Sequence, residues 1–277
     1  MVWGCCKVIA LSVFVVKHRR LDYNCSMSNK NTSSENNPLP FAPPSIKGNI
    51  VILTGAGVSA ESGLKTFRDG GGLWENHRVE DVATPQGFIN NPKLVQRFYN
   101  LRRKQLQTVE PNAAHTALAQ LEREWQGEFL LVTQNVDNLH ERAGSKNVLH
   151  MHGELLKVSC QKTLEIFKWN EDIEIGTTEC PCCKQVNNLR PYIVWFGEIP
   201  LYMDAIATAL MNCDTFIAIG TSGQVYPAAG FVQEAKFHKA TTIECNMEPS
   251  HNRYFDHGLY GPATTKVPLF AQSVIRP

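Results

Sequence analysis

The sequence predicts an α/β protein built on a doubly wound parallel sheet, and two observations lead to that prediction. Short apolar runs rich in β-branched residues recur along the chain, and each ends in glycine or a small polar residue. Segments with apolar residues at helical spacing lie between these runs, so strands and helices alternate. In such sheets, ligands bind at the carboxyl ends of the strands, where the glycines and polar residues would meet.

The first predicted strand, Ile50 to Leu53, leads directly into Gly55-Ala56-Gly57. Glycines there would let a diphosphate approach the main chain. Ser59 and Ala60 are expected to begin a helix whose unpaired N–H groups attract anions. The same pattern is also typical of a tight strand-to-helix turn with no ligand, so on these residues alone both interpretations stay open.

A glycine-rich loop follows this turn. Phe67-Arg68 leads into Asp69-Gly70-Gly71-Gly72, which holds too much glycine to be helical, and the loop ends on the large apolar pair Leu73-Trp74. We expect this loop to act as a flexible lid over a ligand.

Length and composition exclude some classes of protein. The 277 residues are enough for one large domain with a small insertion, and 43% hydrophobic with 19% charged residues fits a globular enzyme. The balance of 27 basic against 26 acidic side chains argues against a nucleic-acid-binding protein, which gains affinity from clustered positive charge. A small molecule or a peptide is the expected partner.

The amino-terminal region contains an apolar run, Val8 to Val16, followed by Lys17-His18-Arg19-Arg20. The run is far shorter than the roughly 20 residues of a spanning helix, and its charges follow the apolar stretch instead of preceding it as in a signal peptide. We expect residues 1–48 to be a disordered extension, or sequence upstream of a start at Met27. The folded domain is expected over residues 49–277.

Two amphipathic helices are predicted next. Pro92 begins the first, whose apolar positions include Leu94 and Phe98. Its other face carries Arg97, Arg102, Arg103 and Lys104, and a cationic face of this kind is usually solvated. Pro111 to His115 precedes the second helix, for which His115 is expected to be a capping or structural residue.

A second predicted strand, Phe129 to Val132, ends in the polar cluster Gln134-Asn135-Val136-Asp137-Asn138. An amide and a carboxylate at this edge could recognise a carboxamide, which both donates and accepts hydrogen bonds. The alternative is an Asx-rich turn that caps the following helix.

Two histidines, His150 and His152, lie two residues apart on a segment expected to be extended. Imidazole is the side chain best suited to move a proton at neutral pH. Side chains with this spacing on a strand point the same way, so a metal pair is conceivable, but no carboxylate or third histidine has matching spacing.

The cysteines favour a metal site over disulfide bonds. Of nine cysteines, Cys180, Cys182 and Cys183 lie within four positions and Cys160 lies upstream, which is metal-ligand spacing and indicates a reducing compartment. Between Cys160 and Cys183 the chain loses periodicity, as expected of a small module held by a metal. Cys213 and Cys245 lie in apolar surroundings and are expected to be buried.

The second half adds three predicted strands: Tyr192 to Phe196, Thr215 to Ile219, and Thr241 to Cys245. Each ends in glycine or a polar residue, as the first does. The alternation completes a Rossmann-like, doubly wound sheet with a small inserted cysteine-containing module.

Several long motifs resemble those of one family. The blocks GAGVSAESGLKTFRDGGGLW, TQNVDNLHERAG and HMHGEL resemble the sirtuin family of NAD-dependent protein deacylases, and HRVEDVATPQGF and FYNLRR are similar to the bacterial CobB type. The resemblance covers roughly Asn49 to Val267. It implies an enzyme that removes acetyl and succinyl or malonyl groups from protein lysines with NAD. We expect this enzyme to be cytoplasmic and monomeric. The implied products are nicotinamide and O-acyl-ADP-ribose.

The resemblance also implies roles for particular residues. The catalytic residues would be His152, Asn135 and Asp137, with His150 a structural neighbour and Arg68 shielding the intermediate from water. Tyr99 and Arg102 match a Tyr-x-x-Arg pair that receives acidic acyl groups, because a guanidinium binds a carboxylate bidentately and a phenol adds a hydrogen bond. The implied NAD contacts are Gly55, Ala56, Gly57, Ser59, Ala60, Phe67, Arg68, Trp74, Gln134, Asn135, Asp137, Gly220, Thr221, Ser222, Asn246, Met247, Glu248 and Ala263. The implied peptide contacts are Val194, Phe196, Gly197 and Glu198, through strand addition.

Sirtuins usually hold one structural zinc between two C-x-x-C pairs, which would place a zinc module at about residues 155–192. Here Cys180 and Cys183 keep the second pair, but Cys160 has no nearby partner. The expected ligands are therefore Cys160, Cys180 and Cys183, with the fourth missing or unusual: Cys182, a water or a shifted residue.

Two other functions remain compatible with the sequence. An NAD-dependent oxidoreductase would share the cofactor but would not cleave nicotinamide. A non-catalytic regulator would bind NAD without turnover.

Overall fold

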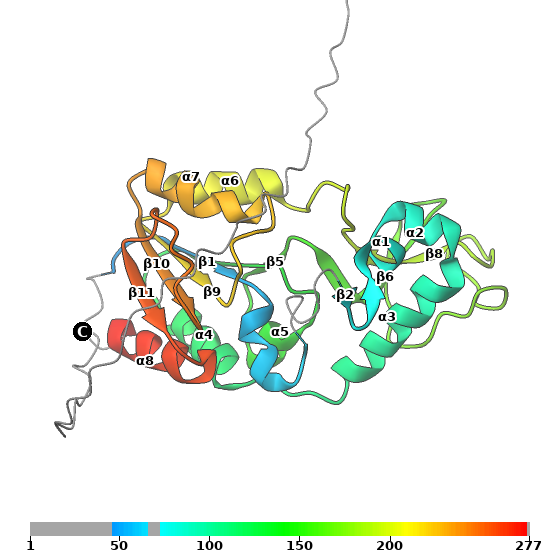
Figure 1. Ribbon diagram of the computed structural model, residues 1–277, viewed down its shortest axis with the longest axis horizontal. Coiled ribbons are helices and arrows are strands. Elements are labelled where there is room, and N and C mark those ends of the chain that lie inside the picture. The colour runs from blue at the N-terminus through cyan, green and yellow to red at the C-terminus, as the bar shows by residue number, and fades with distance from the viewer. Residues whose placement is uncertain (1–45, 66–72, 276–277) are drawn as a thin grey trace, which may run out of the picture. The chain divides into compact units, whose positions relative to one another are not determined.

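The computed structural model describes residues 46–65 and 73–275 of the chain (Figure 1). Six parallel strands form the central sheet in the order β11-β10-β9-β1-β4-β5. The strands are β1 (Ile50–Thr54), β4 (Phe129–Thr133), β5 (Val148–His150), β9 (Thr215–Ile219), β10 (Thr241–Asn246) and β11 (His257–Tyr260). The order reverses beside β1, because β9 pairs with one edge of β1 and β4 with the other. The predicted doubly wound α/β fold is confirmed.

Helices cover both faces of this sheet because its strands are apolar on both faces. Ile50 and Ile52 pack with α4 (Ala113–Glu124) and α8 (Ala263–Ile275) on one face. Val51 and Leu53 pack with α6 (Met203–Asn212) and α7 (Phe231–Phe237) on the other. Figure 1 shows α6 and α7 above the sheet and α4 and α8 below it.

A second region carries the remaining elements. Its three-stranded antiparallel sheet has the order β7-β6-β8, formed by β6 (Gly153–Cys160), β7 (Ile166–Lys168) and β8 (Leu189–Ile193). The helices α1 (Val79–Val82), α2 (Pro85–Asn90) and α3 (Pro92–Leu106) pack beside a short hairpin, β2 (Leu73–Trp74) and β3 (His77–Arg78). The remaining short elements are α5 (Leu139–Ala143), η1 (Ala56–Val58), η2 (Ala60–Ser62) and η3 (Ala228–Gly230).

The turn after β1 differs from the sequence prediction. Ser59 and Ala60 do not begin an α-helix: two short 3₁₀ helices, η1 and η2, follow the strand, and the second ends at Gly63 in the left-handed conformation. The glycines have a packing reason as well. A Cβ on Gly57 would lie 2.7 Å from Gly220 Cα, so the turn after β1 lies directly against the turn after β9. Gly57 N–H donates to Gly220 O at 2.8 Å across this contact.

Two other predictions need correction. The strand expected at Tyr192 to Phe196 is β8, which ends at Ile193 and belongs to the antiparallel sheet. On α3 the cationic face is not fully solvated, because Arg103 is completely buried. Its Nε donates to Glu171 O at 3.1 Å and its NH2 donates to the Asn100 side-chain oxygen, so protein acceptors replace water at these two nitrogens.

Among the described residues, no helix combines the length and the apolarity needed to cross a membrane. The expected extension at residues 1–48 lies almost wholly outside the described residues. So does the predicted lid at Asp69 to Gly72, together with Phe67 and Arg68.

Candidate active site

A cavity of about 590 Å³ lies at the carboxyl ends of β1, β4, β9 and β10. It extends from the turns that follow these strands to α3 and to the segment after β8. The volume falls in the range of small-molecule and cofactor sites. The switch in strand order beside β1 is where an open α/β sheet is expected to bind a ligand.

A buried polar cluster borders this cavity between β1 and β4. Asn135 Nδ2 donates to Ser59 Oγ at 3.1 Å and to Gly55 O at 3.2 Å, and Ser59 Oγ donates to Asp137 Oδ2 at 3.1 Å. Burial raises the pKa of Asp137, although bonds from Leu139 N–H and the Ser59 hydroxyl oppose that rise. Because Asp137 Oδ1 accepts from Leu139 N–H at 3.1 Å, the predicted helix-capping alternative is also partly correct.

His115 supports this cluster from α4. Its Nδ1 accepts from Asn112 N–H at 3.2 Å, which completes a capping box, so the predicted capping role is confirmed. With Nδ1 as acceptor we assign the proton to Nε2, which lies 3.3 Å from Ser59 Oγ. Burial lowers the pKa of His115 to about 4, so the ring is neutral at pH 7.

His152 borders the same cavity from the turn between β5 and β6. Its Nδ1 lies 3.1 Å from Gln134 O, a carbonyl that can only accept, so we assign the proton to Nδ1. Nε2 then keeps its lone pair. Burial lowers the pKa of His152 despite that hydrogen bond, which leaves a neutral imidazole with a basic nitrogen at neutral pH.

His150 does not share this position. The chain turns at Met151 and His152, so the two histidines are not on one extended strand as the sequence suggested. His150 is buried, with Nδ1 3.1 Å from Asn135 O and Nε2 2.7 Å from Glu141 Oε1. Burial lowers its pKa, but the bond and charge of Glu141 outweigh burial and raise it overall. Glu141 thus favours the charged form of this ring, and Nδ1 contacts the Asn135 carbonyl oxygen.

The turns after β9 and β10 form another side of the cavity. Gln134 Nε2 donates to Thr221 Oγ1 at 3.0 Å, and Asn246 Nδ2 donates to Thr221 O at 2.9 Å. These bonds join the ends of β4, β9 and β10. Gly220 has a φ of 60°, a conformation that favours glycine, and no side chain would fit there against Gly57.

An aromatic wall lies at the α3 end. Trp74 meets Phe98 edge to face at 4.9 Å, and Tyr99 OH accepts from Trp195 Nε1 at 2.8 Å. Burial raises the pKa of Tyr99 well above its ordinary value, so its hydroxyl stays protonated and can donate. Arg102 follows one turn later, with NH1 donating to Phe98 O at 3.2 Å and NH2 3.5 Å from Glu75 Oε2.

The segment after β8 is held by its own hydrogen bonds. Val194 N–H donates to His152 O and Phe196 N–H to Ala83 O, both at 2.9 Å. The Glu198 carboxylate accepts from Arg190 and, at 2.8 Å, from Trp195 N–H. Glu198 thus fixes the bend of this segment, in which Gly197 has a φ of 93°.

The cavity brings together most of the predicted site residues. Glu248 is exposed and does not line it, and Phe67 and Arg68 lie outside the described residues. The lining includes Gly55, Ala56, Gly57, Ser59, Ala60, Trp74, Tyr99, Arg102, Gln134, Asn135, Asp137, His152, Val194, Phe196, Gly197, Glu198, Gly220, Thr221, Ser222, Asn246, Met247 and Ala263.

Sequence reasoning missed several other lining residues, among them Lys65, Glu75, Trp195 and Tyr226. Lys65 lies inside the block GAGVSAESGLKTFRDGGGLW, but the sequence assigned no chemistry to it or to the other three. The one available signal was position: Glu75 and Trp195 directly adjoin predicted site residues.

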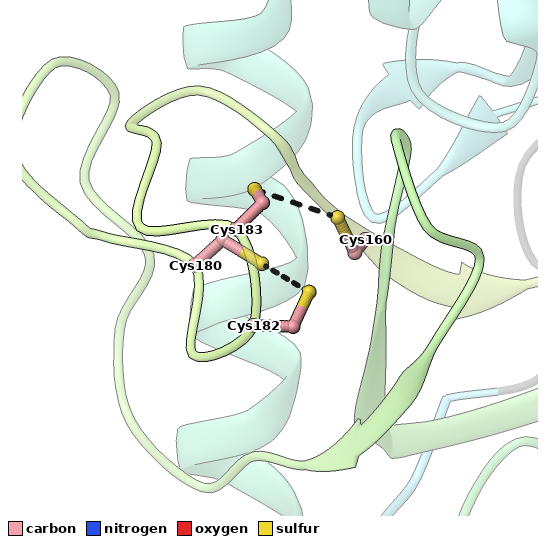
Figure 2. Close-up of side chains that lie close together, drawn as sticks. All are labelled: Cys160, Cys180, Cys182 and Cys183. Atoms are coloured by element: carbon pink, nitrogen blue, oxygen red, sulfur yellow. Dashed lines mark hydrogen bonds between the residues drawn. The ribbon is translucent and has the colours of Figure 1, made fainter.

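Four cysteines cluster in the second region, and Figure 2 shows their side chains directed toward one another. Their sulfur atoms all lie within 4.8 Å of one another, with Cys160 3.7 Å from Cys183 and Cys180 3.4 Å from Cys182. Cys182 therefore occupies the fourth position, which the sequence prediction had left open. A tetrahedral zinc with Zn–S of about 2.3 Å requires S···S separations of about 3.8 Å, so the arrangement fits that ion.

The chain matches known proteins over most of its length. Residues 55–227 match the model of the Sir2 family. An NAD-dependent protein deacylase of Pasteurella multocida is 63% identical over 224 residues, which are 80% of this chain and 95% of that protein. A solved Sir2 homologue in complex with NAD is 39% identical with a TM-score of 0.75, covering 82% of this chain and 89% of that one. A Sir2 structure bound to acetylated peptide is 27% identical with a TM-score of 0.67, covering 82% and 92%.

Proposed function

The chain belongs to the Sir2 family and is an NAD-dependent protein deacylase, and from that premise we propose which residues bind NAD and acyl-lysine and which carry the reaction. One observation supports the assignment above all others. His152 borders the same cavity as the buried pair Asn135 and Asp137, and the hydrogen bond at its Nδ1 leaves Nε2 basic.

The cavity is suited to NAD in size and in chemistry. A volume of about 590 Å³ at the strand-order switch matches a cofactor site. We propose that the turn at Gly55 to Gly57 holds the diphosphate, with Ser59, Ala60 and Trp74 beside it. The adenosine end would lie against Gly220, Thr221, Ser222, Asn246, Met247 and Ala263, which form the other side of the cavity.

Bound NAD would supply the acyl acceptor: the amide oxygen of acyl-lysine would displace nicotinamide from the ribose, and addition of one water would release the lysine amine and leave the acyl group on a hydroxyl of ADP-ribose. The His152 base takes a ribose hydroxyl proton onto Nε2 and holds the imidazolium through Nδ1–H and Gln134 O. Asn135 and Asp137, fixed by Ser59, bind the nicotinamide carboxamide, with the amide and the carboxyl group offering both a donor and an acceptor.

The α3 end of the cavity supports acceptance of acidic acyl groups as well as acetyl. A succinyl or malonyl chain ends in a carboxylate, for which Arg102 is a bidentate donor and Tyr99 a further donor. Both side chains line the cavity at its α3 end. A plain acetyl group needs neither of them.

The acyl-lysine peptide lies along Val194 to Glu198. Because the N–H groups of Val194 and Phe196 already donate within the chain, strand addition here would use main-chain carbonyl oxygens and the Gly197 N–H.

The four-cysteine cluster is proposed to hold one structural zinc. Four thiolates are a soft donor set suited to this ion, and they leave no open position for catalysis. None of the six described cysteines forms a disulfide, which supports the proposal of a reducing, cytoplasmic location.

Release of nicotinamide from NAD in the presence of peptides bearing acetyl-, succinyl- or malonyl-lysine tests the function. We expect release with all three and matching loss of the acyl group. His152→Ala should lower kcat at least ~10³-fold while NAD still binds. Arg102→Met should spare deacetylation and depress desuccinylation roughly 10-fold or more.

Other outcomes would contradict specific parts of this proposal. NAD reduction without nicotinamide release would indicate an oxidoreductase, and binding without turnover would indicate a regulator. Full activity of His152→Ala would exclude its role as base, and equal loss of all activities in Arg102→Met would exclude the acidic acyl pocket.

A further inference from the structure

We propose that Glu75 is a specificity-determining residue, whose carboxylate occupies the Arg102 guanidinium and competes with the terminal carboxylate of an acidic acyl group. The inference rests on the proposed acyl pocket at Tyr99 and Arg102. It adds an internal competitor that sets the balance between neutral and acidic acyl chains.

The contact between Glu75 and Arg102 lies inside the cavity. Glu75 Oε2 is 3.5 Å from Arg102 NH2, and the two side chains are only 13% and 14% exposed. Both residues line the cavity together with Tyr99. A pair this sheltered is screened less than a surface ion pair, so the carboxylate neutralises much of the cation that a substrate would otherwise meet.

Glu75 leaves part of the hydrogen-bonding capacity of Arg102 unused. Arg102 NH1 donates to Phe98 O at 3.2 Å, so this nitrogen is already engaged by the helix. Arg102 Nε is buried with no hydrogen-bond partner among the described residues, and NH2 has only the 3.5 Å contact with Glu75. A carboxylate at the Nε–NH2 edge could accept from both nitrogens, which is the strong fork geometry. An acyl carboxylate that adopts this geometry would displace Glu75.

The backbone at Glu75 is an independent sign that its side chain matters. Glu75 and Asn76 form the two-residue turn of the β2–β3 hairpin, with φ of 50° and 66°. Such turns favour asparagine, aspartate or glycine at both positions, and glutamate has no local advantage there. The strained position nevertheless directs a carboxylate into the cavity.

Glu75 also has a second cationic partner. Lys65 Nζ lies 3.2 Å from the same Oε2, and the Lys65 side chain is 61% exposed. When an acyl carboxylate takes Arg102, Glu75 can keep its bond to Lys65 at the mouth of the cavity. The Glu75 carboxylate, once displaced from Arg102, therefore still has a cationic partner.

This arrangement adapts one pocket to two kinds of acyl group. With acetyl-lysine bound, Glu75 neutralises Arg102, so the small apolar group does not face an unpaired buried cation. With succinyl- or malonyl-lysine bound, the acyl carboxylate replaces Glu75. Acidic substrates are thus accepted at the expense of breaking one internal ion pair.

The test is the ratio of kcat/KM for succinyl-lysine to that for acetyl-lysine on one peptide sequence. Glu75→Gln keeps the size of the side chain and removes its charge. We expect the ratio to rise roughly three- to tenfold, as for a partly buried ion pair, mainly through a lower KM for the succinyl peptide. Glu80→Gln is the matched control, because Glu80 lies on the neighbouring helix α1 and is 67% exposed. Within the described part of the chain its one ion pair is with Arg78, so the ratio should not change in this variant.

A double-variant cycle distinguishes this inference from the acyl pocket on which it rests. In an Arg102→Met background, Glu75→Gln should no longer change the ratio, since the two residues act through one contact. An unchanged or lower ratio in Glu75→Gln, or the same rise without Arg102, would overturn the inference. If Arg102→Met alone lowers desuccinylation selectively in that experiment, the acyl pocket stands even where the role of Glu75 fails.

Discussion

The protonation state of His152 follows from one contact. Its Nδ1 faces a carbonyl oxygen, so the ring keeps its proton there, and burial lowers its pKa below the ordinary value of 6.5. A base with a lowered pKa stays deprotonated, and hence active, at more acidic pH. The acid limb of kcat/KM should therefore show an apparent pKa below 6.5, measured as nicotinamide release over pH 5 to 8.

An NAD titration by fluorescence at each pH serves as the control, because it separates loss of the base from loss of cofactor binding. A limb at or above 6.5 with unchanged NAD affinity would mean that the imidazole is protonated more readily than its surroundings indicate. In that case the Gln134 carbonyl would stabilise the cation more than burial opposes it.

Individual residues also show which parts of the site could be predicted from the sequence. The types at positions 135, 137 and 152 predicted an amide, an acid and a base at one sheet edge, and the cavity brings them together. The separation of His150 from His152 depends on a two-residue turn at Met151 and His152, and the signal that could have predicted it is Gly153, which follows the turn with a φ of 83°. The fourth cysteine was equally ambiguous, since ligand spacing in sequence does not fix where adjacent thiols point.

Helix α3 links the two regions through two adjoining faces. Tyr99 and Arg102 line the cavity, whereas Gln96, Asn100 and Arg103 contact backbone of the cysteine module. Gln96 Nε2 donates to Leu189 O at 2.7 Å and Asn100 Nδ2 to Ile173 O at 3.1 Å. Helical periodicity predicted the apolar stripe but not this second, polar face, because the carbonyls that satisfy it come from more than 60 residues away.

Apart from the four cysteines and the contacts with α3, the cysteine module has only a small apolar core. Its buried cluster contains only Val158, Cys160, Ile173, Cys180 and Leu189, so two of its five members are metal-ligand candidates. We expect Cys182→Ser to lower zinc content below one per chain. Hydrogen exchange of residues 160–189 should then rise ~10-fold or more, because metal binding supplies folding free energy to small modules.

Cys213→Ser provides the comparison, since Cys213 is buried between α6 and β9, outside the four-cysteine cluster. In this variant the zinc content and the hydrogen exchange of residues 160–189 should be unchanged. Retention of one zinc by the Cys182 variant would show that three thiolates and another ligand suffice. That result would support the three-ligand interpretation of the sequence over the four-sulfur geometry.

At the scale of the whole molecule, alternation of strands and helices predicted the fold class, and the structure confirms it. The strand order was not predictable, because pairing of β1 with both β4 and β9 depends on contacts between distant segments. The glycines after β1 illustrate this limit. Their pattern indicated that a ligand approaches the main chain here. Glycine is also required because the turn after β9 packs too closely against this turn to leave space for a side chain.

Acid stability of the whole fold should reflect the buried histidines beneath the site. His115 and His140 lie with ring centroids 4.9 Å apart, and burial lowers both pKa values, that of His115 to about 4. In the unfolded chain each titrates near 6.5, so between pH 6.5 and about 4 the unfolded state binds more protons. Stability is therefore fully present above pH 6.5 and is lost as pH falls.

His115→Gln should isolate this effect. Glutamine at this helix position can keep the capping-box acceptor but cannot titrate. When the pH is lowered from 7 to 5, the free energy of unfolding should fall by about 2 kcal/mol less in the variant than in the parent. Urea melts at both pH values measure this difference. His257→Gln, at an exposed position in β11, is the control, and its free energy of unfolding should fall by as much as that of the parent. Equal losses in all three proteins would mean that His115 is already protonated in the folded state at pH 5, which its donor in Asn112 N–H and its burial both oppose.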